Sequence, residues 1–213
     1  MNCLSSSLQQ TYSDSLQALK EGNHRFCTNQ SLHTRQDMAR VAELKDDQRP
    51  FAVIVGCSDS RVTPEIIFDQ GLGDLFSIRT AGNVMGSYEV GSVEYAVEHL
   101  GTTLVVVLGH TGCGAVKAFI DTMQNNDYQV FSEKSNHIQS IINRLASQHE
   151  MHEIFASDHC TVYYNAVKAN VIHGLNQLRA SNLLLSKKYK KGELLIIGAI
   201  YHIETGKVEF LNS

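Results

Sequence analysis

The sequence predicts an α/β fold in which helices flank a mostly parallel β-sheet. Residues 51–56 (FAVIVG) and 103–109 (TLVVVLG) are continuous apolar runs that end in glycine. Such runs are typical of strands that are buried on both faces of a sheet. Segments with apolar residues at helical spacing lie between and after them, as in chains whose parallel strands are joined by right-handed helical crossovers.

The first predicted element is a helix over residues 13–27. Leu16, Leu19 and Phe26 are spaced for one helical face, and Ser13 or Asp14 can cap the start. This helix belongs to an N-terminal helical arm, residues 1–46, which precedes an α/β core of residues 47–213. The chain has no internal repeat and no Pro/Gly-rich linker, so we expect a single domain over residues 1–213.

The core continues from the strand at 51–56 to a second strand at 75–80. A helix at 88–101, with an apolar stripe along one face, leads to the strand at 103–109. Two further helices are expected at 136–148 and 161–181. The chain closes with two strands within 192–211 around a turn at Thr205-Gly206. The result is a Rossmann-like sheet with a C-terminal strand pair.

Composition excludes several classes of function. The chain is 43% hydrophobic and 19% charged, which is typical of a soluble globular protein, and its net charge of −4 offers no footprint for nucleic acid. Its apolar runs are far shorter than the about 20 residues that cross a bilayer, and the N-terminus lacks the features of a secretory signal. We therefore expect no nucleic-acid or membrane partner and a cytoplasmic location, where the five cysteines stay reduced.

Two strands are followed by residues that can bind a metal. Cys57 follows the run at 51–56, and His110-Thr-Gly-Cys113 follows the run at 103–109. Sites in parallel sheets form beyond the carboxyl ends of the strands, so these three side chains are expected to meet. Two thiolates and an imidazole suit zinc, and three protein ligands leave a fourth position open, as in catalytic zinc sites.

Asp59 and Arg61 follow Cys57 at every second residue. In an extended segment, all three side chains leave on the same side. Asp59 is an alternative fourth ligand, or it accepts a hydrogen bond from water on the metal. We expect Arg61 to bind the Asp59 carboxylate and keep it off the zinc. The predicted chemistry is attack of zinc hydroxide on a small electrophile.

The motifs "CSDSR" and "GHTGCGA", some fifty residues apart, resemble those of the β-class carbonic anhydrases. The resemblance extends from "LKEGNHRF" to "GAIYHIETGKVEFL" and covers nearly the whole chain. It implies a carbonate dehydratase that reversibly hydrates CO2 to bicarbonate and a proton. It also implies one Zn²⁺ per chain on Cys57, His110 and Cys113, an Asp59–Arg61 catalytic pair, and assembly into dimers that pair into tetramers in some members.

The resemblance further assigns five residues to the CO2 pocket: Gln48, Phe76, Ala81, Tyr95 and Gly114. Gln48 would donate a hydrogen bond to a substrate oxygen. Phe76 and Tyr95 would come from across a dimer interface or from the adjoining wall, and Ala81 stands where relatives often carry valine.

The absence of tryptophan favours the plant-like subtype. A second subgroup uses a tryptophan in a regulatory bicarbonate site and rests with the aspartate on zinc, so we expect an open, non-allosteric centre here. His99 matches a position suggested as a proton shuttle in plant-like relatives, and its alternative is a structural role in its helix.

Three other functions compete with this prediction. A relative on the same zinc platform could hydrolyse CS2 or COS. A zinc-stabilised binding module would have a closed site with Asp59 on the metal. A thiol redox protein would need a Cys-x-x-Cys pair, and His110-x-x-Cys113 contains only one thiol.

Overall fold

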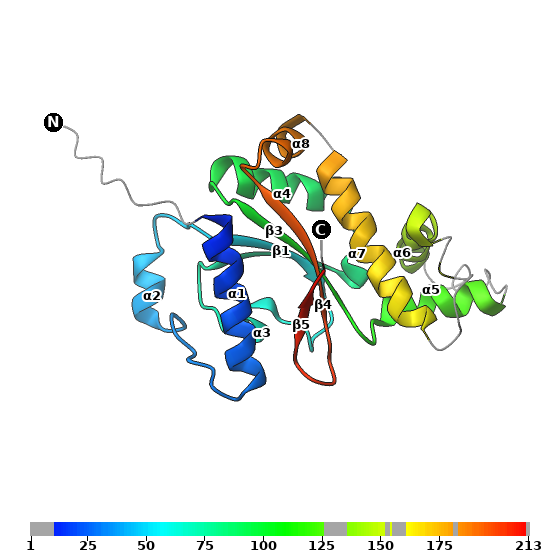
Figure 1. Cartoon of the computed structure of the whole chain (residues 1–213), viewed down its shortest axis with the longest axis horizontal. Helices are drawn as coiled ribbons and strands as arrows, with labels where there is room; N and C mark the ends of the chain where they lie inside the picture. The colour runs from blue at the N-terminus through cyan, green and yellow to red at the C-terminus, as the bar shows by residue number, and fades with distance from the viewer. Residues whose placement is uncertain (1–10, 126–135, 152–153, 155–160, 181–182, 212–213) are drawn as a thin grey trace.

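A computed structural model of the chain describes residues 11–125, 136–151, 154, 161–180 and 183–211. Within these residues, one sheet has the strand order β2-β1-β3-β4-β5 (Figure 1). The first four strands in this order are mutually parallel, and β5 pairs antiparallel with β4. The strands are β1 (Ala52–Cys57), β2 (Leu75–Thr80), β3 (Leu104–His110), β4 (Leu195–Tyr201) and β5 (Val208–Phe210). The predicted fold class and the C-terminal strand pair are confirmed.

The helices account for most of the remaining described residues. They are α1 (Tyr12–Cys27), α2 (Met38–Glu43), α3 (Pro64–Ile67), α4 (Ser87–His99), α5 (Gly114–Asn125), α6 (Asn136–Ala146), α7 (Val162–Ala180) and α8 (Leu183–Lys190), with 3₁₀ turns η1 (Ala81–Asn83) and η2 (His149–Met151). The predicted helices correspond to α1, α4, α6 and α7. The apolar pattern of the sequence does not predict α2, α3, α5 and α8, of which α3 spans only four residues and α5 begins inside a glycine-rich motif.

The two faces of the sheet bury alternate residues of the central strands β1 and β3. On one face, Val53 and Val55 of β1 pack into a core cluster with α4, α5, α6, α7 and α8. On the other face, Ala52 and Ile54 pack with Leu19 of α1 and with α3. Figure 1 shows α1 and α7 on opposite sides of the sheet. Because strands buried on both faces need apolar residues at every position, this explains the continuous runs in the sequence.

The strand order reverses direction between β1 and β3. From β1 the chain steps outward to β2, whereas from β3 it steps the opposite way to β4. Ligands of open parallel sheets bind at such a reversal, beyond the carboxyl ends of the strands. Among the described helices, none combines the length and the apolar character that crossing a membrane requires.

Candidate metal centre

Three metal-binding side chains meet at the carboxyl ends of β1 and β3, where the strand order reverses. Cys57 is the last residue of β1, His110 is the last residue of β3, and Cys113 directly precedes α5. All three are buried, and their ligand atoms lie within 4.8 Å of one another. The structure therefore brings together the three residues that the sequence predicts as a zinc site.

The imidazole of His110 is held in the orientation that a metal ligand needs. Its ring is fully buried, and Nδ1 lies 2.9 Å from the carbonyl oxygen of Thr111. Donation from Nδ1–H to this carbonyl leaves Nε2 with its lone pair free. Nε2 has no hydrogen-bond partner among the described residues. A buried, unpartnered polar atom is costly, and a metal ion at the two sulfurs would supply its missing partner.

Backbone N–H groups stabilise negative charge on both sulfurs. The Cys57 sulfur accepts from the N–H of Asp59 at 3.4 Å and of Gly82 at 3.3 Å. The Cys113 sulfur accepts from the N–H groups of Ala115 and Val116 in the first turn of α5. These groups and the helix dipole favour a thiolate at this position.

The two thiols ionise at different pH values because they interact. A hydrogen bond from the Cys113 thiol is the main cause that lowers the pKa of Cys57 to about 4, although burial of the sulfur acts in the opposite direction. The hydrogen bond to Cys57 and burial together raise the pKa of Cys113 above its usual range. A divalent cation between the sulfurs would remove this mutual penalty and ionise both thiols. The donor set, two thiolates and one imidazole, fits zinc.

Asp59 and Arg61 form a bidentate ion pair beside these ligands. Arg61 Nε donates to Asp59 Oδ1 at 2.9 Å, and Arg61 Nη2 donates to Asp59 Oδ2 at 2.7 Å. The predicted pairing is present, but its geometric basis differs from the extended segment that the sequence suggests. After Cys57 the chain turns, and the N–H of Val62 donates to the carbonyl of Asp59 at 3.0 Å. This turn brings Arg61 back to Asp59.

The ion pair keeps the Asp59 carboxylate ionised next to the metal ligands. The side-chain hydrogen bond from Arg61 is the main cause that holds the pKa of Asp59 well below its usual range. Asp59 Oδ2 lies 4.0 Å from His110 Nε2. Arg61 Nη2 also lies 3.4 Å from the carbonyl oxygen of Gly112, so the pair contacts both sequence motifs.

Arg79 is a site residue that the sequence analysis missed. It lies on β2, where it is paired in register with Gly56. Its Nε donates to the carbonyl of Cys57 at 2.9 Å, and its Nη2 donates to the carbonyl of Asp59 at 2.7 Å. Arg79 thus fixes the backbone between the metal ligand and the carboxylate. The sequence contains a signal for this role, because a charged residue near the carboxyl end of a predicted strand indicates a site residue.

Four of the remaining predicted site residues do not reach the metal ligands within one chain. Gln48 is exposed and precedes β1, whereas Cys57 ends it. Phe76 pairs in register with Val53, four residues before Cys57. Its ring lies 6.2 Å from that of Tyr95, which lies 5.2 Å from that of His99.

The other two predicted pocket residues follow groups of the metal centre directly. Ala81 comes after Thr80, which pairs with Cys57 at the end of the sheet, and Gly114 comes after Cys113. The structure therefore divides the six residues into two near the ligands and four on the surface formed by β2, α4 and the segment before β1.

Comparison with known proteins gives consistent matches over most of the chain. A family model described as carbonic anhydrase matches residues 52–208. A carbonic anhydrase of Mycolicibacterium smegmatis is 38% identical over 192 residues, which cover 90% of this chain and 89% of the relative. Carbonic anhydrase 2 of Mycobacterium tuberculosis is 37% identical over 190 residues, which cover 89% of this chain and 88% of the relative.

Solved structures show the same fold. The structure of the β-carbonic anhydrase CcaA matches with a TM-score of 0.71 and 26% identity, and the match covers 93% of this chain and 99% of that one. Tetrameric β-carbonic anhydrases from Sordaria macrospora match with a TM-score of 0.67 and 19% identity over 94% of this chain and 98% of theirs.

Proposed function

This chain belongs to the carbonic anhydrase family, and we propose that Cys57, His110 and Cys113 hold its zinc ion. The reaction is the reversible hydration of CO2 to bicarbonate and a proton. One observation carries the proposal: the three ligand atoms lie within 4.8 Å of one another at the strand-order reversal, and His110 Nε2 lacks a partner among the described residues. When bound, the ion would supply Lewis acidity that lowers the pKa of a coordinated water to about 7.

Asp59 is proposed to orient the attacking water by accepting a hydrogen bond from it. The carboxylate can do so because it is ionised and lies beside the ligand set. Arg61 donates to both of its oxygens, which opposes a move of Asp59 onto the metal. This supports a resting centre that is open to water, as in the plant-like, non-allosteric subtype.

The CO2 pocket is proposed to be completed by a second copy of the chain. Phe76, Tyr95 and His99 form an aromatic row, and Tyr95 is 48% exposed. The row lies on β2 and α4, and β2 is the edge strand of the sheet among the described residues. An exposed aromatic row beside an unpaired strand edge suits an interface. A dimer, or a tetramer of two dimers, would bring this row and Gln48 to a partner's metal centre.

The proposed function is tested with metal analysis and stopped-flow kinetics on the purified protein. We expect about one zinc per chain and rapid CO2 hydration, and we expect Cys113→Ala to lose both. A parallel assay with CS2 distinguishes the related hydrolase, because faster turnover of CS2 than of CO2 would contradict the proposal. A Cys113→Ala protein that keeps about one zinc per chain and hydrates CO2 at the wild-type rate would remove this residue from the ligand set.

A further inference from the structure

One backbone segment joins the metal centre to helices α6 and α7. The segment from Thr80 to Gly86 leads from β2 into α4, and the N–H of Gly82 donates to the Cys57 sulfur at 3.3 Å. Gly82 has a φ of 67°, and a Cβ added there would lie 2.9 Å from the Cβ of Ala115. Only glycine fits this position without strain. The Gly82 peptide is thus confined between a metal ligand and the first turn of α5.

A buried pair of amide side chains holds Gly82 from its carbonyl side. Asn170 of α7 donates through Nδ2 to the carbonyl oxygen of Gly82 at 2.7 Å. Gln148, just before η2, donates through Nε2 to Asn170 Oδ1 at 2.8 Å. Asn170 is 3% exposed and Gln148 is 1% exposed. Buried amides cost free energy unless they are hydrogen-bonded, and here the Asn170 amide uses both its donor and its acceptor.

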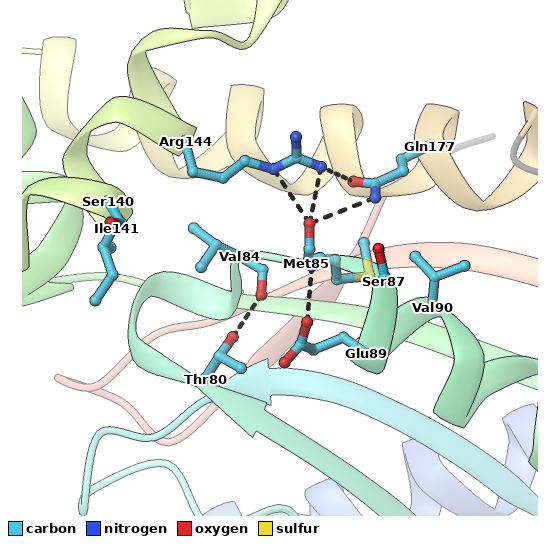
Figure 2. A pocket seen from close by; sticks show the side chains of 11 residues that line it. Thr80, Val84, Met85, Ser87, Glu89, Val90, Ser140, Ile141, Arg144 and Gln177 are labelled. Atoms are coloured by element: carbon cyan, nitrogen blue, oxygen red, sulfur yellow. Dashed lines mark hydrogen bonds between the residues drawn. The ribbon is translucent and has the colours of Figure 1, made fainter. Parts of the chain in front are cut away.

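A second group of polar contacts fixes the same segment three residues further on. Arg144 of α6 donates through Nε and Nη2 to the carbonyl oxygen of Met85 at 3.1 and 2.8 Å, and Gln177 of α7 donates to it at 3.4 Å. Figure 2 shows these bonds converging on Met85 at the wall of a cavity of about 550 Å³. Glu89 in that cavity accepts from the N–H of Gly86 at 2.7 Å. These polar side chains already bond the backbone between Thr80 and Gly86. We therefore assign no ligand to the cavity.

We propose that Asn170 is a positioning residue for the zinc ligand Cys57. By holding the carbonyl of Gly82, it keeps the Gly82 N–H directed at the Cys57 sulfur, and Gln148 keeps the Asn170 amide in the required orientation. Residues outside the ligand set that orient ligands in this way change metal affinity by about 10- to 100-fold when they are mutated. The inference rests on Cys57 being a zinc ligand, as the proposed function states.

The test is zinc affinity, measured by competition with a chromophoric chelator, in wild type and Asn170→Leu. The leucine side chain has the same number and branching of heavy atoms but cannot hold Gly82, so we expect the zinc dissociation constant to rise by about 10- to 100-fold. Cobalt substitution adds a spectroscopic readout. Loss of the hydrogen bond to the Cys57 sulfur makes its electrons easier to transfer, so the sulfur-to-cobalt charge-transfer band should move to longer wavelength.

Asn23→Leu is the matched control. Asn23 is a buried amide of α1 that donates to the carbonyls of Ile67 and Gly206 and has no contact with the metal ligands. The Asn23→Leu substitution should lower the free energy of unfolding, while the zinc affinity and the cobalt spectrum stay at the wild-type values.

Gln148→Leu keeps the test decisive if Asn170→Leu fails to fold. It leaves Asn170 in place but frees its amide, so zinc affinity and the cobalt band should change in the same direction and by less. Wild-type affinity and an unshifted band in the folded variants would overturn the role of Asn170. Failure of the wild type to bind zinc at all would instead contradict the proposed ligand set.

Discussion

At the scale of single residues, the centre depends on how Asp59 is held. Its two carboxylate oxygens accept bonds from the guanidinium of Arg61, and the backbone N–H of Arg61 adds a third bond at 3.0 Å. Charge-assisted, bidentate bonds are stronger and more directional than single neutral ones. Asp59 is therefore held in one position and carries a full negative charge at neutral pH.

Substitution Asp59→Asn tests this assignment. The amide has the same size and can still contact Arg61, but it cannot act as a charged acceptor. We expect zinc content to stay at the wild-type level while the CO2 hydration rate falls by about 10²- to 10⁴-fold, the usual contribution of a positioned proton acceptor. Metal analysis and stopped-flow kinetics measure both quantities.

Asp121→Asn provides the comparison for the previous substitution. Asp121 is also paired with a cation, Lys117, but it lies on the exposed side of α5. The CO2 hydration rate of the Asp121→Asn protein should match that of the wild type. An Asp59→Asn protein that hydrates CO2 as fast as this control would exclude Asp59 from the reaction.

At the scale of the elements, Asp69 links the segment after α3 to α1 and to the loop that follows α1. Its side chain is 1% exposed, accepts from Arg25 Nε at 2.6 Å, and also accepts from the N–H groups of Leu32 and His33. Burial is the largest single influence and raises its pKa, but the hydrogen bonds from Arg25, Leu32 and His33 outweigh it. The net result is a pKa of Asp69 below its usual value.

Asp69→Asn should therefore destabilise the fold in a pH-dependent way. Because the folded-state pKa is lowered, the stabilisation is fully present above the unfolded pKa of about 3.9 and is lost as the pH falls through the folded value. We expect a loss of about 2–4 kcal/mol at pH 6, since removing one partner leaves Arg25 without its charge partner. Urea unfolding of the zinc-free proteins measures it.

The difference in free energy of unfolding between the wild type and the Asp69→Asn protein should become smaller as the pH falls below about 4. The control is Glu43→Gln, which breaks the exposed ion pair with Arg40. It should lower the free energy of unfolding by at most about 1 kcal/mol. A gap between wild type and Asp69→Asn that is constant from pH 6 to pH 3 would show that the charge of Asp69 contributes nothing.

Contacts between elements that are distant in the sequence explain why parts of the site are not predicted from the sequence. The sequence predicts β1, β3 and α7 because their apolar patterns are continuous or strictly periodic, and it predicts the metal ligands because they follow strand ends. It does not predict that Arg79 and Asn170 contribute. Both act through backbone carbonyls, of Cys57 and Gly82, and these contacts exist only after distant elements have packed together.

Short helices are missed for a local reason. Helix α5 starts at Gly114 in a glycine-rich motif, and glycine disfavours helix formation. Helix α2 has six residues, none of them buried, so it lacks the apolar stripe by which a helix is recognised. Tertiary contacts decide whether such segments are helical.

At the scale of the whole molecule, the position of four predicted site residues supports the proposed dimer. Gln48, Phe76, Tyr95 and His99 lie away from the metal ligands of their own chain. The resemblance assigns Gln48, Phe76 and Tyr95 to the CO2 pocket and His99 to a proton shuttle, and the proposed dimer would place them beside the metal centre of a second copy.

Tyr95→Ala should weaken self-association and lower activity together. Removing this ring takes away the centre of the aromatic row between Phe76 and His99. Sedimentation velocity should show a dimer or tetramer for the wild type and a shift to smaller species for the variant, with a lower rate per chain. Tyr163→Ala, a partly exposed tyrosine of α7, should change neither. A wild type that is monomeric and fully active would contradict the shared site.

The most direct test of the metal centre is a zinc titration of the chelator-stripped protein, followed by stopped-flow CO2 hydration. If Cys57, His110 and Cys113 hold one catalytic zinc, activity will be absent at first, rise in proportion to zinc bound, and reach a plateau at about one ion per chain, whereas the Cys57→Ala protein will regain none. Hydration by the stripped protein, or recovery by the Cys57→Ala protein equal to that of the wild type, would contradict the account.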